Sequence, residues 1–525
     1  MEELRLLSLG TSDFSALRLR NQIYVDKSAL VYKVASRTGK FLFVRPRRFG
    51  KSLLISTFES LFKFGLRDFK GLAIEKLWKE TKTYNMVRLD FSEIRADFGL
   101  DKFKEDLRDR LIDNLSPFGF RYDSAGPSIF CQFSAWLKKQ EPNSLVLLID
   151  EYDTPLSSCL NDPELFNSVQ DALSDFYAVL KSNDDALRFV FITGIVNCNK
   201  GRLLSELQEL KDISLDTTFG GLLGFTKGEV EEYFYPYLET ASRALNLPVF
   251  ELLEKVIKQY GGFCFERSAI EKVIAPWSLL NFLASPRNGL LDYWFESGGK
   301  ASALTEGLKS GSMSDPEEYG REKLISLSGS PSLESLSDLA LLTQTGYLTI
   351  KAVKYGDTVF LDYPNLEVKK AMAQLYVEHL LRGRSPGQVG AGPIVRVLSE
   401  NSAESLVEIL NHFFVAIDYQ RNPIKDEASV RTFNQVYFAG AGLESKVVTG
   451  AANGRSDLEV KVNDRHWTLE FKVCRGQENP DQKLEEAVEQ LKLKGYGDDS
   501  SSENLIKIAL VFSLEDRKFI RWKEV

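Results

Sequence analysis

Short unbroken apolar runs alternate with stretches of helical periodicity in the first part of the chain. Three apolar runs are typical of buried parallel strands. They are residues 40–44 (KFLFV), the run within residues 144–156 that ends at Asp150 and Glu151, and residues 187–194 (LRFVFITG). Residues 52–65 carry apolar side chains at helical spacing, and Gly65 is a helix stop signal. This order predicts an α/β domain with a parallel sheet.

The middle of the chain changes pattern several times. Residues 225–245 and 275–285 predict helices, the first with Thr226 as cap and Glu229 three positions later. Residues 343–381 predict two strands around a Gly-Asp turn and then a helix, which suits a winged-helix module that binds DNA or packs between domains. Residues 310–333 predict a mobile loop, and the Gly/Pro-rich residues 382–393 predict a link. We therefore predict domains at 1–224, 225–381 and 394–525.

Alternating apolar and polar residues flank Asn463-Asp464 within residues 454–473, which predicts a β-hairpin. If the turn closes on these two residues, Asp457 lies directly opposite Glu470, and Lys472 shares the face of Glu470. Trp467, Leu469 and Phe471 then occupy the other face and form core.

Composition narrows the class of protein. The chain has 525 residues, which indicates two to four domains, with 43% hydrophobic and 27% charged residues. No apolar run reaches the about 18 residues that span a bilayer, and the N-terminus lacks a signal-peptide core. The five cysteines are scattered, which fits reduced residues in a cytoplasmic protein. A net charge of −8 neither indicates nor excludes nucleic acid.

The chemistry of the first domain centres on Gly50-Lys51-Ser52, the end of a phosphate-binding loop whose first glycine is replaced by Arg45. The segment lies between a predicted strand and a predicted helix, whose N-terminus favours phosphate. Arginine side chains of the loop would contribute to phosphate binding, although a basic turn before an ordinary helix remains the alternative. The predicted nucleotide-binding residues of the loop are Arg45, Pro46, Arg47, Arg48, Phe49, Gly50, Lys51, Ser52 and Leu53.

Three polar residues end the other two predicted strands. Asp150 and Ser52 would hold magnesium, and Glu151 would polarise the attacking water. Thr193 lies at the same edge of the sheet, where it could sense the γ-phosphate or only cap its strand.

In the hairpin, Asp457 and Glu470 would hold a magnesium ion, and Lys472 would orient or activate water. A charged surface hairpin is the alternative, but it leaves the apolar flanks unexplained.

The motifs resemble two known families. LSLGTSDFSALRLRNQIYVDKSALVYKV, RPRRFGKSLL, LLIDEYDTPL and FITGI are similar to the AAA-ATPase-like domain of a large prokaryotic family, over roughly residues 5–225. In that family RPRRFGKS is the usual loop, so the resemblance implies that Arg45 belongs to it. The segment IVNCNKGR after the Thr-Gly strand departs from the family's pattern, so a sensor role there is not supported.

Residues 395–515 resemble the PD-(D/E)XK nuclease superfamily, through Gly454-Arg455-Ser456-Asp457, Glu470-Phe471-Lys472, Gln490 and Lys494-Gly495-Tyr496. The resemblance implies that Gln490 is an accessory polar residue, with a solvated glutamine as the alternative. It also implies that Glu427, on an upstream helix, is a further metal ligand. The family's aromatic-His pair after that glutamate is replaced by SVRTF here, which weakens the assignment of Glu427.

The fold expected is therefore a P-loop ATPase domain, a helical and winged-helix middle region and an α/β restriction-endonuclease-like domain, with ATP and Mg²⁺ as cofactors. The first functional hypothesis is an ATPase that controls or drives a magnesium-dependent nuclease. The second is a nucleotide-dependent switch whose last domain binds nucleic acid or mediates assembly without cutting. The expected partners are nucleic acid, DNA before RNA, and further copies of the chain; no membrane is expected.

Overall fold

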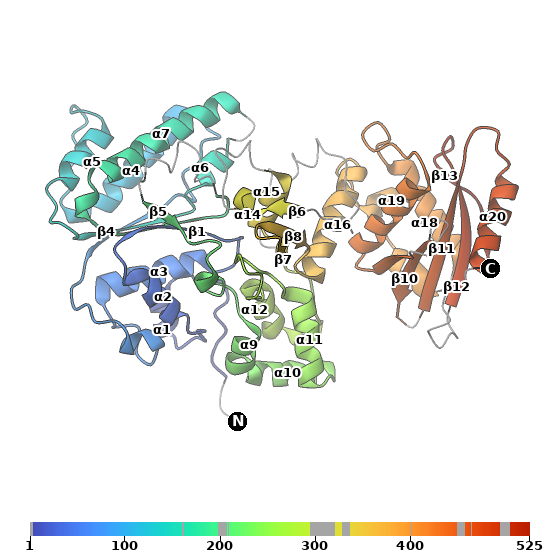
Figure 1. Cartoon of the computed structure of the whole chain (residues 1–525), viewed down its shortest axis with the longest axis horizontal. Helices are drawn as coiled ribbons and strands as arrows, with labels where there is room; N and C mark the ends of the chain where they lie inside the picture. Colours follow the sequence, from blue (N-terminus) through green and yellow to red (C-terminus); the bar gives the residue numbers. More distant parts are fainter. Residues whose placement is uncertain are drawn as a thin grey trace. The chain divides into compact units, whose positions relative to one another are not determined.

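A computed structural model describes residues 4–159, 162–197, 207, 209–294, 321–327, 337–400, 402–448, 457–463, 465–493 and 505–525. The chain forms two compact units (Figure 1). The first contains the described residues up to 294 and those from 321 to 367, and the second contains the described residues from 368 onward. The three predicted domain boundaries remain predictions.

A parallel five-stranded sheet organises the first unit, in the order β2-β3-β4-β1-β5. The predicted strands form β1, β3 and β4, as expected from their apolar runs. Because all five strands run the same way, the ends of β1, β3 and β4 lie at one edge, where α/β sheets bind their ligands. The strands are β1 (Gly39–Val44), β2 (Asn85–Asp90), β3 (Leu145–Asp150), β4 (Leu187–Gly194) and β5 (Leu210–Asp212).

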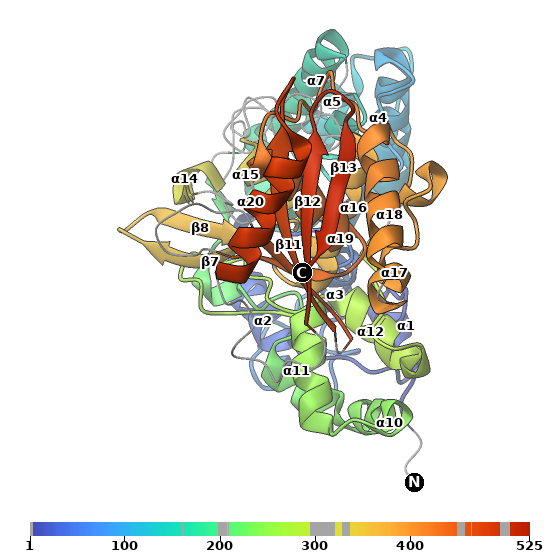
Figure 2. The same ribbon diagram turned by 90° about the vertical axis from the view of Figure 1, so that its right-hand side faces the viewer.

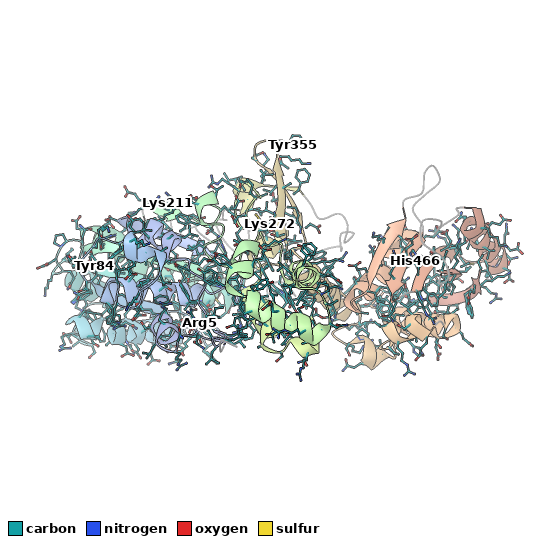
Figure 3. All side chains as sticks on the ribbon, turned by 90° about the horizontal axis from the view of Figure 1, so that it is seen from below. Arg5, Tyr84, Lys211, Lys272, Tyr355 and His466 are labelled. Carbon is teal, nitrogen blue, oxygen red and sulfur yellow. The ribbon has the colours of Figure 1, made fainter. Side chains whose placement is uncertain are left out.

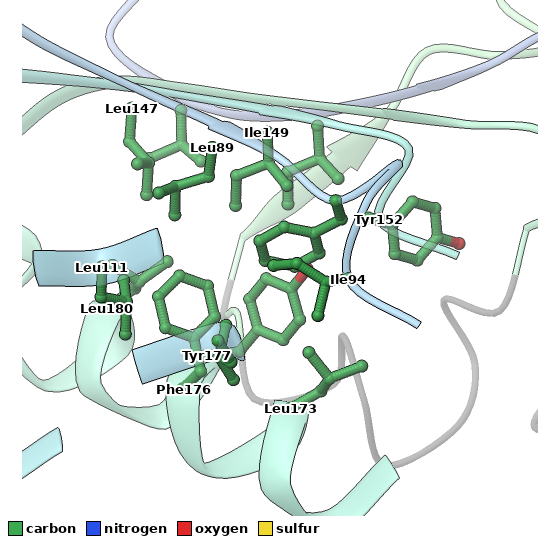
Figure 4. Close-up of a cluster of buried hydrophobic side chains, with 14 of the residues drawn as sticks. Leu89, Ile94, Leu111, Leu147, Ile149, Tyr152, Leu173, Phe176, Tyr177 and Leu180 are labelled. Carbon is green, nitrogen blue, oxygen red and sulfur yellow. The ribbon is translucent and has the colours of Figure 1, made fainter. Parts of the chain in front are cut away.

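Helices cover both faces of this sheet. On one face, Leu89, Leu147 and Ile149 form a buried cluster with Phe176 and Tyr177 of α7 (Figure 4). On the other face, the ring of Phe58 in α3 lies 4.6 Å from that of Phe191 in β4. The helices before and among these strands are α1 (Phe14–Leu19), α2 (Ser28–Ala35), α3 (Lys51–Phe64), α4 (Leu100–Leu115), α5 (Ile129–Leu137), α6 (Thr154–Ser157) and α7 (Pro163–Ser182).

The helix expected at 225–245 is two helices, because Pro236 in the first turn of α10 removes a backbone donor and α9 ends at Tyr233. The predicted capping box is present, with Thr226 and Glu229 exchanging hydrogen bonds at the start of α9. The helices of this region are α9 (Lys227–Tyr233), α10 (Tyr235–Leu245), α11 (Val249–Tyr260) and α12 (Pro276–Ala284).

The strands and helix predicted around the Gly-Asp turn are confirmed as β7 (Thr349–Lys354), β8 (Thr358–Asp362) and α16 (Leu366–Leu380). Tyr355, at the tip of the hairpin, is 84% exposed (Figure 3). The predicted loop at 310–333 is wrong where it is described, since residues 321–327 form β6 (Arg321–Lys323) and α14 (Leu324–Leu327); the rest of that loop lies outside the described residues. Helix α15 (Asp338–Gln344) precedes β7.

A second five-stranded sheet, in the order β13-β12-β11-β10-β9, organises the second unit. Strands β11 and β12 are parallel and joined through α20, whereas the other pairs are antiparallel. The strands are β9 (Glu444–Val448), β10 (Asp457–Val462), β11 (Arg465–Cys474), β12 (Leu505–Ser513) and β13 (Lys518–Glu524), and the helices are α17 (Ile394–Glu400), α18 (Ala403–Ala416), α19 (Glu427–Gly440) and α20 (Pro480–Leu493).

The two faces of this sheet carry different helices (Figure 2). Trp467 donates through Nε1 to the carbonyl of Leu398 in α17, and Phe414 of α18 lies 4.9 Å from Phe512, so α17 and α18 cover the face of Trp467. Helix α20 covers the other face, where its apolar residues pack with Ala509. Trp467, Leu469 and Phe471 are fully buried, as predicted.

The α/β fold class is therefore confirmed: one unit is built on a parallel sheet and the other on a mixed sheet, and helices flank both sheets. The predicted link at 382–393 is ordered and contains a 3-10 helix at Pro386–Val389, because Ser385 and Gln388 form a capping box there. Over the described part of the chain, we find no helix that is both long and apolar enough to cross a bilayer.

Candidate functional site

The loop predicted to bind phosphate connects β1 to α3, so the predicted order of strand, loop and helix is confirmed. Gly50 has φ 99°, a left-handed conformation that favours glycine, and it immediately precedes the first helical residue, Lys51. Lys51 is 6% exposed, and its Nζ donates to the carbonyls of Arg45 and Pro46, each at 3.0 Å. The loop thus folds around the lysine side chain.

Electrostatics at Lys51 combine burial with nearby acids. Burial lowers the pKa of the ammonium, while Asp153, Glu151 and Asp150 raise that pKa in part. Because three acids outweigh the charge of one ammonium, phosphate is favoured here only together with a cation that offsets the acids.

Arg45 lies elsewhere than the sequence suggested. It is 2% exposed, and its guanidinium donates to the carbonyls of Val44 and Ser214 at 2.8 Å and Phe219 at 3.2 Å. Its guanidinium carbon also lies 4.0 Å from the ring centre of Phe43. These contacts point the side chain into the core of the unit, and Arg45 does not line the pocket beside Lys51.

That pocket has a volume of about 500 Å³. From the predicted loop, its lining includes Arg47, Arg48, Phe49, Gly50, Lys51, Ser52 and Leu53, whereas Pro46 is not part of it. Glu151 also lines the pocket, so the loop and the end of β3 meet there. The remaining wall is largely apolar and includes Val25, Phe225 and Leu280. A cavity with a basic loop at one side and an apolar wall suits a nucleotide.

Asp150 and Thr193 are joined at the ends of neighbouring strands. Thr193 donates through Oγ1 to Asp150 Oδ1 at 2.5 Å, and both residues are almost fully buried. Glu151, the next residue, has φ 53° and accepts a hydrogen bond from Thr154 Oγ1 at 3.1 Å. Burial raises the pKa of the Glu151 carboxyl. A non-glycine residue in the left-handed region is a common feature of functional sites.

Asp153 is a buried site residue that the sequence reasoning missed. Its carboxylate accepts hydrogen bonds from the backbone N–H groups of Ile195 and Val196, the latter at 2.9 Å. A Cβ on Gly194 would lie 2.5 Å from Asp153 Oδ1, so only glycine permits this approach. The signal in the sequence was the Thr-Gly end of the strand, whose glycine has a packing role.

Lys27 was also missed as a site residue, although it lies in a motif that resembles the AAA-ATPase-like family. Lys27 lines the pocket, and its Nζ lies 2.6 Å from the carboxylate of Glu229 at the start of α9. The pair joins positions 202 residues apart, a distance over which a sequence pattern carries no signal. Across the same pocket, the Arg48 guanidinium stacks 4.4 Å from the ring centre of Trp277.

In the second unit, the predicted hairpin register is confirmed. Asp457 is the partner of Glu470, and Val462 is the partner of Arg465. The backbone therefore places the two acids at one level of the sheet. The Asp457 side chain lies outside the described part, as do Gly454-Arg455-Ser456 and Lys494-Gly495-Tyr496.

Lys472 brings two acids together on this sheet. Its Nζ lies 3.5 Å from Glu470 Oε1 and 3.8 Å from Glu427 Oε2. Glu470 is fully buried and Lys472 is 8% exposed, whereas Glu427 is more open at the start of α19. The structure thus places Glu427, Glu470 and Lys472 side by side.

Gln490 lies on α20, the helix that packs on Ala509. Ala509 is the register partner of Glu470, so α20 covers the face on which Glu470 lies. The Oε1 atom of Gln490 is buried and accepts no hydrogen bond within the described residues. Within those same residues, to which the Asp457 side chain does not belong, no three His, Cys, Asp or Glu side chains are grouped to hold a metal.

A known protein resembles this chain over almost its whole length. A protein of Azotobacter chroococcum mcd 1, described as an uncharacterized protein in the vnfD 5' region, is 27% identical and covers 98% of both chains. Among solved structures, Cdc6p of Pyrobaculum aerophilum shares 9% identity over 80% of this chain and 86% of that chain, with a TM-score of 0.25. The ORC2 protein of Aeropyrum pernix shares 10% identity over 80% and 85%, also with a TM-score of 0.25. Structural similarity at this level supports no inference.

Family models match both units. Residues 8–204 match the family described as predicted AAA-ATPase, and residues 425–522 match the PD-(D/E)XK nuclease superfamily. Both matches coincide with the motifs described above, from the phosphate loop to the hairpin of Glu470. A model of an AAA-ATPase-like domain and a model of the PD-(D/E)XK nuclease superfamily therefore match the chain in this order along the sequence.

Proposed function

We propose that the first unit binds and hydrolyses ATP. The observation that carries this proposal is the meeting of Lys51, Ser52 and Glu151 in one pocket at the ends of β1 and β3. Lys51 binds the outer phosphates, exchanging its bonds to loop carbonyls for charge-assisted bonds. The N–H groups at the start of α3 bind phosphate oxygens. The side chain of Arg45 stabilises the base of the loop from the core of the unit and does not contact the nucleotide.

The residues present fit a magnesium ion beside the phosphates. Ser52 and Asp150 would hold it, since hydroxyl and carboxylate oxygens suit this ion, and Thr193 fixes the Asp150 carboxylate. When bound, the ion would neutralise phosphate charge. Glu151 orients the attacking water and accepts its proton, because its carboxyl faces the pocket and has a pKa raised toward neutrality.

We propose further that the second unit cleaves phosphodiester bonds. The proposal depends on Lys472, which lies within 4 Å of both Glu470 and Glu427. Glu470, Glu427 and Asp457 would hold magnesium, and the unsatisfied Oε1 of Gln490 is a further oxygen donor on the same face. When bound, this ion would polarise the phosphoryl group and activate its water. Lys472 orients that water and stabilises the charge that develops on the phosphate.

We propose that ATP turnover in the first unit controls cleavage by the second, in a cytoplasmic protein that acts on nucleic acid. The pairing of an ATPase-like and a nuclease superfamily domain in one chain supports this. The test is cleavage of labelled DNA and RNA with magnesium, with and without ATP. Cleavage that requires both supports the proposal, whereas ATP-dependent binding without any cleavage would favour a switch that does not cut.

A further inference from the structure

A basic groove in the second unit lies apart from the proposed nuclease site. The groove has a volume of about 660 Å³, and it is lined by Arg382, Arg384, Arg517, Lys518 and His412 together with uncharged residues. No aspartate or glutamate is among the described residues that line it. Four permanently charged cations therefore line one groove, although the whole chain has a net charge of −8.

The groove lies on the side of the sheet opposite the face of Glu470. Its wall includes Asn411 and His412 of α18, and α18 covers the face of Trp467. Arg517 ends the turn between β12 and β13, and Lys518 is the first residue of β13. The groove is therefore a separate surface and not the rim of the proposed catalytic site.

Several contacts fix the shape of the groove. The side chain of Asn411 exchanges two hydrogen bonds with the backbone of Phe519, at 3.1 and 2.6 Å, which ties α18 to β13. Arg517 has φ 55° and stacks 4.5 Å from the ring centre of Tyr419. Arg384 donates to the carbonyls of Leu381 and Ala416. These cations are positioned before any ligand arrives, which lowers the entropic cost of binding.

The acids near the groove do not cancel its charge. Asp418 is largely buried and lies 3.2 Å from Arg382 and 4.0 Å from Arg421, so one carboxylate faces two guanidinium groups. Asp516 accepts a hydrogen bond from Ser513 within the turn. Arg384, Arg517 and Lys518 have no carboxylate partner among the ion pairs of the described residues. Their charge is therefore available to a polyanion.

We propose that this groove binds the sugar–phosphate backbone of nucleic acid and anchors it on the side of the domain away from the catalytic face. Three of the four cations are arginine, whose planar fork matches phosphate oxygens. Four cations around a groove of about 660 Å³ suit an extended polyanion better than one small anion. The inference rests on the proposed function, because it takes nucleic acid as the ligand of this domain.

The test is DNA binding by the full chain in EDTA, where metal-dependent cleavage cannot interfere. A labelled DNA duplex of about two helical turns is titrated by fluorescence anisotropy over a range of salt concentrations. Lys518→Glu and Arg384→Glu are compared with Arg396→Glu, which makes the same charge change on a side chain that is 76% exposed on α17 and outside the groove. Lys518→Gln is a milder variant, and thermal melting checks that each protein is folded.

Each groove variant is expected to bind DNA about three- to ten-fold more weakly, with the slope of log K against log salt reduced by about one. The Arg396→Glu control keeps the affinity and slope of the wild type. Groove variants that bind as tightly as this control overturn the inference, as does a wild type that binds no DNA. Labelled poly-glutamate is tested in the same way. If it binds more tightly than DNA and Lys518→Glu weakens its binding, the ligand is an acidic protein segment and the inference is overturned.

The two proposals fail separately. DNA binding that depends on the groove, without any cleavage in magnesium, leaves the inference intact and removes the nuclease activity. If the wild type cleaves DNA but the groove variants bind DNA normally, the nuclease activity is supported and the inference about the groove is overturned.

Discussion

Thr193 Oγ1 donates a hydrogen bond of 2.5 Å to Asp150 Oδ1, across the ends of the neighbouring strands β4 and β3. The sequence left two roles open for Thr193, a phosphate sensor and a strand cap. The bond indicates a third role, because it orients the carboxylate proposed to hold magnesium.

Thr193→Val is expected to remove this bond with little change in shape. A buried carboxylate that loses a donor costs about 1–3 kcal/mol, so urea unfolding should show that loss of stability. ATP affinity should fall about ten-fold with magnesium and stay unchanged in EDTA, as measured by calorimetry. Thr193→Ser, which keeps the hydroxyl, is the control. An equal loss of affinity in both conditions would show that Thr193 does not act through the metal site.

Lys51→Ala is expected to weaken ATP binding by about ten- to a hundred-fold, since each charge-assisted bond to phosphate contributes about 1.5–3 kcal/mol. Lys63→Ala, on the same helix and away from the pocket, is the matched control. Calorimetry on folded protein measures both. Equal affinities of wild type and Lys51→Ala would remove the assignment of the pocket.

Glu151→Gln should bind ATP normally and hydrolyse it about 10²–10⁴-fold more slowly, because the amide cannot accept the proton of water. Burial raises the pKa of Glu151 above its ordinary value of 4.5. Only the ionised form is active, so kcat/KM for ATP should fall on acidification at a pH above 4.5. Glu151→Gln should lose this titration. Normal hydrolysis by the variant would leave Glu151 as a strand-end acid.

Glu367 predicts a pH dependence of stability. It is fully buried, accepts hydrogen bonds from the backbone of Tyr293 and Trp294, and has a pKa raised by burial from 4.5 to about 7. Because the folded state binds this proton more tightly, its contribution to stability is fully present below pH 4.5 and is lost as pH rises to about 7. The loss should be on the order of 1–3 kcal/mol.

Urea unfolding across this pH range measures the effect, and Glu367→Gln should have a flatter profile than the wild type. Parallel profiles for the two proteins would show that Glu367 does not titrate between these limits.

Local signals predicted the elements that carry the sites. The apolar runs defined β1, β3 and β4, and the Asn463-Asp464 turn fixed the register of Asp457 with Glu470, because period and turn geometry act over a few residues. The position of Gly50 before α3 followed from the same local logic.

Long-range packing could not be predicted in this way. The role of Arg45 depends on carbonyls of Ser214 and Phe219, and the partner of Lys27 is Glu229; neither contact leaves a trace in spacing. The resemblance proposed Glu427, but only the fold brings it to Lys472. The composition of residues 382–393 predicted a link between domains. In the structure, glycines of this segment lie in turns, as Gly390 does with φ 80°.

The proposed function requires that Glu470 and Lys472 cut nucleic acid under the control of the nucleotide site. The most direct measurement is cleavage of labelled DNA in magnesium, with and without ATP, by the wild type, Asp457→Asn, Glu470→Gln, Lys472→Ala and Lys51→Ala, with magnesium binding followed in parallel. We expect ATP-dependent cleavage by the wild type and no cleavage by any of the four variants. Lys472→Ala should keep magnesium binding because lysine is not a ligand, whereas Asp457→Asn and Glu470→Gln should lose it. Cleavage by Glu470→Gln or Lys472→Ala at the rate of the wild type would contradict the proposed function.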